Sequence, residues 1–123
     1  MKQVVAITKD GNEGPIPLTW RPALAAIVDA LIDGDPPSLP QVSFQSSAVW
    51  EHAQAYIRDY GAQLVTLPEE TWSSSICIWH GTYWCVLVDL FTEEEGMSDL
   101  VLQVHVHEDG DTYRYEVALV YVP

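Results

Sequence analysis

Five carboxylates lie in or beside one short loop of the sequence, and their density raises the question of metal chemistry. They are Asp89, Glu93, Glu94, Glu95 and Asp99. Carboxylates at this density can bind a hard cation such as calcium or magnesium. The calcium-loop order D-x-D-x-D-G is absent, however, and consecutive glutamates point in different directions. The loop is therefore interpreted as a solvated turn, in which Gly96 supplies a positive φ, or as an acidic contact surface. In that second case the candidate protein-binding residues are Glu93, Glu94, Glu95 and Asp99.

Asp89 differs from the loop residues because it lies inside the apolar run V-L-V-D-L-F. A carboxylate in a buried strand must be paired, hydrogen-bonded or protonated. The guanidinium groups available to pair with it are those of Arg21, Arg58 and Arg114. A position on an open face, or in a structural network, is favoured over a catalytic role.

His105 and His107 are the other residues whose type and spacing are compatible with chemistry. Residues at i and i+2 of a strand share a face, which is compatible with zinc. His80, Glu116 or Asp89 could supply a third ligand, but no spacing fixes it, so neither a metal nor a cofactor is expected. Asp89 with one of the two histidines would form an acid–base dyad. These three residues are weak catalytic candidates, because no nucleophile or oxyanion motif supports them.

Aromatic side chains suggest a second kind of site. The chain has 5 tryptophans and 6 tyrosines. They are expected either to line a pocket between helices and sheet, or to form a core with a protein-binding patch. The candidate ligand-binding residues are Trp50, Trp79, Trp84 and Tyr115.

Composition narrows the classes of partner. The chain has 123 residues, enough for one domain with a real core, and 18 acids against 5 Lys and Arg give a formal charge of -13. Phosphate contacts need clustered Lys or Arg, so nucleic acid is disfavoured, as are anionic membrane surfaces. A basic protein partner is favoured electrostatically, although acidic surfaces also simply aid solubility. The N-terminal sequence has no secretory signal, which favours the cytoplasm.

The two cysteines, Cys77 and Cys85, are expected to be free thiols in that compartment. A three-residue turn at His80–Gly81–Thr82 would nevertheless place them directly across a hairpin, at bridging distance.

The periodicity of the sequence predicts one α+β domain in three parts. Residues 1–18 form an extended segment, with a short strand at Val4–Ile7. Residues 19–61 are helical: one helix begins near Thr19 and ends at Gly34, and another runs from Ser47 to Tyr60. Between the helices a loop packs Leu39 and Phe44. Residues 62–123 alternate with the period of strands, so the expected fold is two N-terminal helices packed on a curved four-stranded antiparallel meander. In the last strand, one face is expected to carry Tyr113, Tyr115, Val117, Leu119 and Tyr121.

Four stretches resemble a family of small uncharacterised bacterial proteins. They are LIDGD, YGAQLVTLP, VDLFTEEEGMSDLVLQV and EDGDTYRYEVALVYV, and TEEEG-x-SDL is the most specific part. The resemblance runs from about Trp20 to the end and implies a domain of unknown function. More distantly, the order of helices and strands resembles the nuclear-transport-factor-2 and cystatin-like superfold, which hosts enzymes, ligand binders and interaction modules.

The leading hypothesis is a non-enzymatic interaction protein whose acidic surface binds a basic partner. An immunity-like protein is one form of this hypothesis. The alternative is a small-molecule binder, isomerase or lyase that uses the aromatic pocket with Asp89 and a histidine. A third hypothesis is a homodimer through the outer face of the sheet, where Val101, Gln103, His105 and Arg114 are expected to lie.

Overall fold

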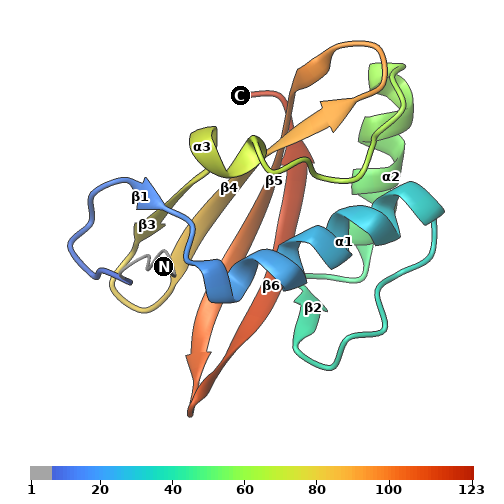
Figure 1. Cartoon of the computed structure of the whole chain (residues 1–123). Coiled ribbons are helices and arrows are strands. Elements are labelled where there is room, and N and C mark those ends of the chain that lie inside the picture. Colours follow the sequence, from blue (N-terminus) through green and yellow to red (C-terminus); the bar gives the residue numbers. More distant parts are fainter. Residues whose placement is uncertain (1–6) are drawn as a thin grey trace.

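The computed structural model describes residues 7–123 and has α+β architecture, as the sequence predicted (Figure 1). The strand expected at Val4–Ile7 falls almost entirely outside the described residues. The helices are the 3-10 turn η1 (Leu18–Trp20), α1 (Arg21–Asp33), α2 (Ala48–Tyr60) and α3 (Thr71–Ser74). The strands are β1 (Gly14–Pro15), β2 (Val42–Phe44), β3 (Ile76–Trp79), β4 (Trp84–Thr92), β5 (Gly96–Asp109) and β6 (Thr112–Tyr121).

The sheet is larger than the predicted four-stranded meander. Its order is β1-β3-β4-β5-β6-β2, so β3 to β6 form the expected meander and a short strand is added at each edge. β2 runs parallel to β6 and pairs over Val42 to Phe44. The prediction of a loop there was wrong, because three residues carry too little alternation to mark a strand. β2 exists through its long-range pairing with Tyr115 to Val117.

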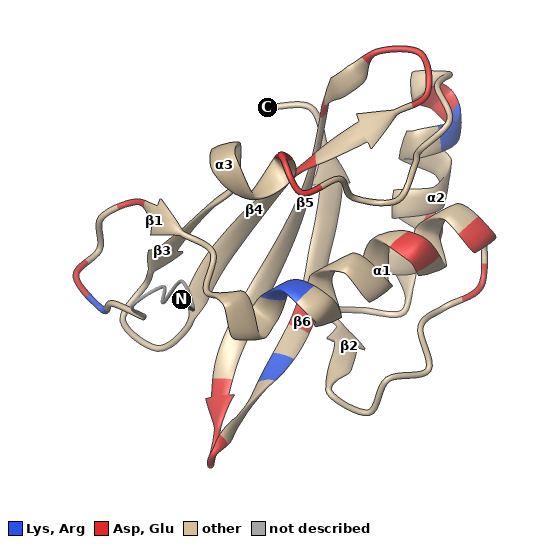
Figure 2. Ribbon diagram, in the orientation of Figure 1, with Lys and Arg blue, Asp and Glu red and all other residues tan. Residues whose placement is uncertain are grey.

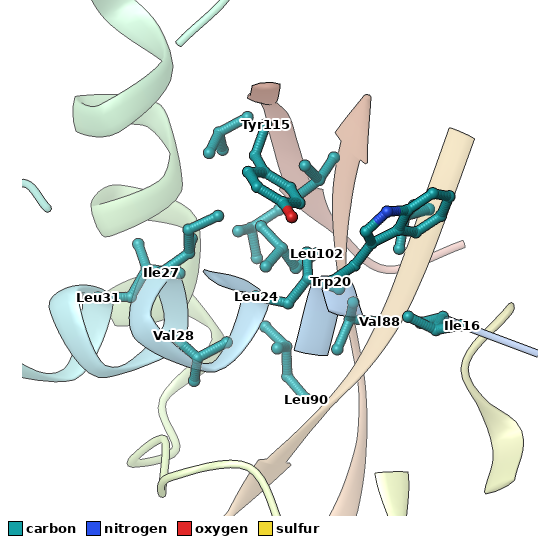
Figure 3. Close-up of a cluster of buried hydrophobic side chains, with 14 of the residues drawn as sticks. Ile16, Trp20, Leu24, Ile27, Val28, Leu31, Val88, Leu90, Leu102 and Tyr115 are labelled. Carbon is teal, nitrogen blue, oxygen red and sulfur yellow. The ribbon is translucent and has the colours of Figure 1, made fainter. Parts of the chain in front are cut away.

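Helix α1 crosses one face of the sheet and supplies the helical side of the core (Figure 1). It ends at Gly34, whose φ of 82° is left-handed, the conformation in which glycine is least strained. Its apolar stripe, with Trp20 just before it, is buried against the strands (Figure 3). The members on the helical side are Trp20, Leu24, Ile27, Val28 and Leu31, and those on the strands include Val86, Val88, Leu90, Leu102 and Val104.

Helix α2 has the predicted bounds within one residue but not the predicted position. It stands beside the free part of the β6 edge instead of lying across the sheet (Figure 1). Only Ala53 of this helix is buried. Trp50 packs edge-on against Phe44 of β2 at 5.8 Å, and the Tyr56 hydroxyl accepts a hydrogen bond from the Val122 N–H at 3.2 Å. Helix α2 therefore packs against the edge of β6 beyond the point where β2 ends.

A bulge in β6 corrects the predicted assignment of its faces. Gln103 pairs with Leu119 and Val104 pairs with Val117, so Ala118 is an extra residue. An inserted residue shifts the two-residue period of a strand. Val120 consequently enters the core, and Leu119, 40% exposed, turns outward. Simple alternation cannot reveal such a switch.

The β3–β4 hairpin also has a different register from the one considered in the sequence. Trp79 pairs with Trp84, so the turn holds the four residues between them. Cys77 pairs with Val86, and Cys85 pairs with Ile78. The two thiols are thus on opposite faces of the sheet and are free.

Across residues 7–123, no helix combines the length and apolar character that a membrane crossing requires.

Candidate functional site

The four aromatic candidates do not surround a common cavity. Trp84 is 1% exposed and packs against Trp20 at 5.1 Å and Trp79 at 4.6 Å. Tyr115 is buried in the same core, and Trp50 lies apart, on Phe44. The space between α1 and the sheet is therefore filled with side chains. The hollows that border these elements are open surface grooves: one of about 400 Å³ lies between α2 and β6, and one of about 430 Å³ lies between α1 and the start of β6.

Asp89 is held by hydroxyl groups, not by an arginine. The Ser74 hydroxyl donates to its carboxylate at 2.5 Å. Its backbone N–H donates to the Ser75 hydroxyl at 2.9 Å, and its carbonyl accepts from the Thr71 hydroxyl at 2.6 Å. Within the described part of the chain Asp89 makes no ion pair, and Arg21, one of the three expected partners, instead lies over the Trp72 ring of α3. Asp89 thus ties α3 to the edge of β4.

The hydroxyl donors around Asp89 were missed in the sequence. They come from the run T-W-S-S-S, which begins α3 and leads into β3. A helical turn brings residues three and four apart onto one side, so Thr71, Ser74 and Ser75 face the same strand. The cluster of small hydroxyl residues was the available signal.

His105 and His107 lie together on the face of the sheet opposite α1. Tyr83 packs against both imidazoles, with ring centroids 4.4 Å from His105 and 5.6 Å from His107, and stacks on His80 at 5.5 Å. Glu116 on β6 is 3.3 Å from His107 and 3.8 Å from His105. Burial lowers the pKa of His105; Glu116 opposes this shift, and His107 and His80 add to it. His105 is therefore mainly neutral near pH 7.

The structure separates these histidines from Asp89. Asp89 pairs with Val101 on β5, and His105 is four residues further along that strand, which corresponds to about 13 Å. The two groups are too far apart for direct proton transfer. Among the described residues, no group of three His, Cys, Asp or Glu side chains has the geometry to hold a metal ion.

The thiols lack the character of nucleophiles. Burial raises the pKa of Cys77 to about 11 and also raises that of Cys85. The thiolate is the reactive form, so both side chains act as small apolar groups near neutral pH.

Figure 2 shows the carboxylates of the β4–β5 loop at the tip of that hairpin, next to the end of α2, whose last turn carries Arg58. Glu95 accepts hydrogen bonds from the Tyr60 hydroxyl at 2.8 Å and the Thr92 hydroxyl at 3.2 Å. Glu94 accepts from the Gln63 N–H at 3.1 Å. On α1, Asp29 accepts from the Thr66 hydroxyl at 2.7 Å. The segment from Tyr60 to Thr66 thus links the loop to α1. We call Asp29, Glu93, Glu94, Glu95 and Asp99 the acidic end.

Tyr60 connects α2 to this end. Its hydroxyl also accepts the Asp99 N–H at 3.3 Å. That hydrogen bond lowers the pKa of Tyr60, but the Glu95 carboxylate, desolvation and the nearby charges outweigh it and raise the pKa overall. Gly96, with a φ of 72°, closes the loop as predicted. The loop conformation therefore presents Glu93 outward while Glu94 and Glu95 are fixed.

Comparison with known proteins places the chain in a family without adding an activity. The model of a family described as "Domain of unknown function (DUF7668)" matches residues 28–123. The match agrees with the resemblance to an uncharacterised domain, and it begins within α1, so that β1 and η1 precede it. No curated protein and no solved structure matches the chain, and the likeness to the nuclear-transport-factor-2 and cystatin folds stays a prediction. Because this match covers most of its length, the chain belongs to the DUF7668 family.

Proposed function

We propose that this protein is a non-enzymatic binding module whose acidic end engages a basic protein, as an immunity-type or regulatory protein would. One observation carries the proposal: three of the five carboxylates of the acidic end, those of Asp29, Glu94 and Glu95, are held by neutral donors. Tyr60, Thr92, Gln63 and Thr66 orient them without cancelling their charge. Of the residues described, none of the lysines or arginines forms an ion pair with this end.

Such carboxylates are pre-organised for a cation. Their rotamers are already fixed by hydrogen bonds, so a partner has less side-chain entropy to remove on binding. The formal charge of -13 adds a long-range field that speeds encounter with a basic surface. A hydrogen-bonded carboxylate cluster is therefore better suited to protein recognition than a flexible acidic tail.

The same charge supports a protein as the partner, in preference to nucleic acid or an anionic membrane, because both of those repel an acidic surface. A cytoplasmic location fits free thiols at Cys77 and Cys85. An enzymatic function lacks comparable support, since Asp89 and His105 lie far apart along β5 and the aromatic candidates are packed in or against the core.

A pull-down from a bacterial lysate tests the proposal with two matched variants. The first carries Glu93→Gln, Glu94→Gln and Glu95→Gln, which keep a carbonyl acceptor for the donors of the loop. The second carries Glu108→Gln, Asp109→Asn and Asp111→Asn, which remove three charges at the β5–β6 turn. We expect the wild type and the second variant to retain a basic protein that the first variant loses, with weaker retention as salt is raised.

Two outcomes would contradict this function. One is retention of neutral or acidic proteins alone. The other is equal loss of the basic protein in both variants, which would show that net charge, and not the acidic end, is recognised.

A further inference from the structure

One face of the sheet is covered by no helix in residues 7–123. Helix α1 lies on the other face, and α2 stands at the β6 edge (Figure 1). We call the uncovered side the open face. Its strand pairs place these side chains on this face, with Val101 buried: Ile76, Ile78, Cys85, Leu87, Asp89, Val101, Gln103, His105, His107, Arg114, Glu116, Leu119 and Tyr121.

The middle of the open face is apolar although the chain is acidic. One continuous row across the strands consists of Ile76, Leu87, Gln103 and Leu119, which are apolar except for the uncharged Gln103. Most of the 18 acids lie elsewhere, at turns and helix ends (Figure 2). A sheet face of four strands with an apolar middle is typical of a surface that another sheet covers.

The charges of the open face are separated toward its two ends. At one end, Asp89 and Asp99 line an open groove of about 460 Å³ together with Val101 and Pro123, and none of the described residues that line it is a lysine or arginine. At the other end, Arg114 is exposed and, among the residues described, has no ion pair. Near it, Glu116 is already engaged by His107 at 3.3 Å, and Asp109 lies at the turn. The guanidinium group of Arg114 and the acidic groove that could accept a cation therefore lie on the same face, at its opposite ends.

We propose that a second copy of this chain covers the open face, related by a two-fold axis that runs across the strands. The row of Asp89 and Val101 is six residues along β5 from the row of His107 and Arg114, or about 20 Å. An axis between the two rows brings each Arg114 to the far end of the partner's β6, beside the groove that Asp89 and Asp99 line. The apolar middle then packs against itself, as an isologous interface requires.

The charge pattern favours a second copy over an unrelated protein. A partner chosen for the acidic end would be basic throughout, whereas this face offers both an acidic groove and an unpaired cation. Two chains of charge -13 repel each other, so a stable pair needs an interface from which most carboxylates are excluded. The open face meets that condition, and the acidic end, apart from Asp99, lies outside it.

Two charge reversals at exposed positions test the arrangement. Arg114→Glu sets a carboxylate against Asp89 and Asp99 of the partner, and Asp99→Arg sets two guanidinium groups together. We expect each variant alone to dissociate at least about tenfold more readily than the wild type in sedimentation velocity. Mixed in equal amounts, the two variants restore both contacts and form a heterodimer. Arg58→Glu, an equal reversal on α2, leaves self-association unchanged.

A wild type that stays monomeric up to millimolar concentration would overturn the proposal. So would a wild-type dimer that both reversals leave intact, or variants that fail to associate when mixed although circular dichroism shows them folded. Leu119→Arg gives an independent measurement in the middle of the face, where we expect dissociation without any effect on folding. The pull-down is repeated with Arg114→Glu to measure whether this variant still retains the basic protein. Failure of the dimer proposal is thereby distinguishable from failure of the proposed function of the acidic end.

Discussion

Two buried tryptophans that touch each other differ in a single hydrogen bond. The indole N–H of Trp84 donates to the Thr8 carbonyl at 2.8 Å, whereas the indole N–H of Trp20 is buried and has no partner among residues 7–123. A buried unpaired N–H lowers the free energy of unfolding, because its bonds to water are lost without replacement. The large ring of Trp20 is retained through its packing, since it touches Trp84 and Tyr113.

This difference predicts unequal effects for the same substitution. Trp84→Phe removes ring volume and a hydrogen bond, while Trp20→Phe removes similar volume and the unpaired N–H. We expect Trp84→Phe to reduce the free energy of unfolding by about 1 kcal/mol more than Trp20→Phe. Urea unfolding followed by circular dichroism measures both, and each variant serves as the control for the other. Equal losses, or a larger loss for Trp20→Phe, would contradict the assignment of hydrogen bonds.

At the scale of elements, the turn that shapes the acidic end depends on one glycine. Gly96 has a φ of 72°, and a Cβ added there would meet no atom within 4 Å. Gly14 in β1 is equally uncrowded but has no positive φ. We expect Gly96→Ala to reduce the free energy of unfolding by about 1 kcal/mol, with a smaller effect for Gly14→Ala. Thermal unfolding of the two variants separates backbone strain from side-chain crowding. If Gly96→Ala and Gly14→Ala reduce the free energy of unfolding equally, backbone strain in the β4–β5 turn does not explain the loss at Gly96.

The elements that the sequence predicted are those whose information is local. The apolar stripe and Gly34 define α1, and Gly61 ends α2 at the predicted residue. β1 and β2 were missed because they are two and three residues long and exist through pairing with distant strands. The same limit applies to the site: the carboxylates of the β4–β5 loop were identified, but the donors at Tyr60, Gln63 and Thr66 come from another segment. Both the short strands and the donors of the site depend on tertiary contacts, which the local periodicity of the sequence does not contain.

At the scale of the whole molecule, acidic charge opposes folding. Among the residues described, Lys9 and Glu108 form an ion pair, and Glu116 lies beside the imidazoles of His105 and His107, so most of the net charge of -13 is not compensated. Repulsion among like charges destabilises a compact chain. Carboxylates that a partner would neutralise therefore cost stability in the free protein, which makes salt a useful probe.

We expect sodium chloride to stabilise the protein. Raising its concentration from about 0.01 M to 0.2 M shortens the Debye length from about 30 Å to below 10 Å, which screens repulsion between acids on the surface. A gain of about 1 kcal/mol would raise Tm by about 3–5 °C in a domain of this size, measured by differential scanning calorimetry at low protein concentration. The variant with glutamines at positions 93, 94 and 95 has three fewer charges and should begin at a higher Tm and gain less from salt. If that variant gains as much as the wild type, the carboxylates of the β4–β5 loop are not a source of the repulsion that salt screens.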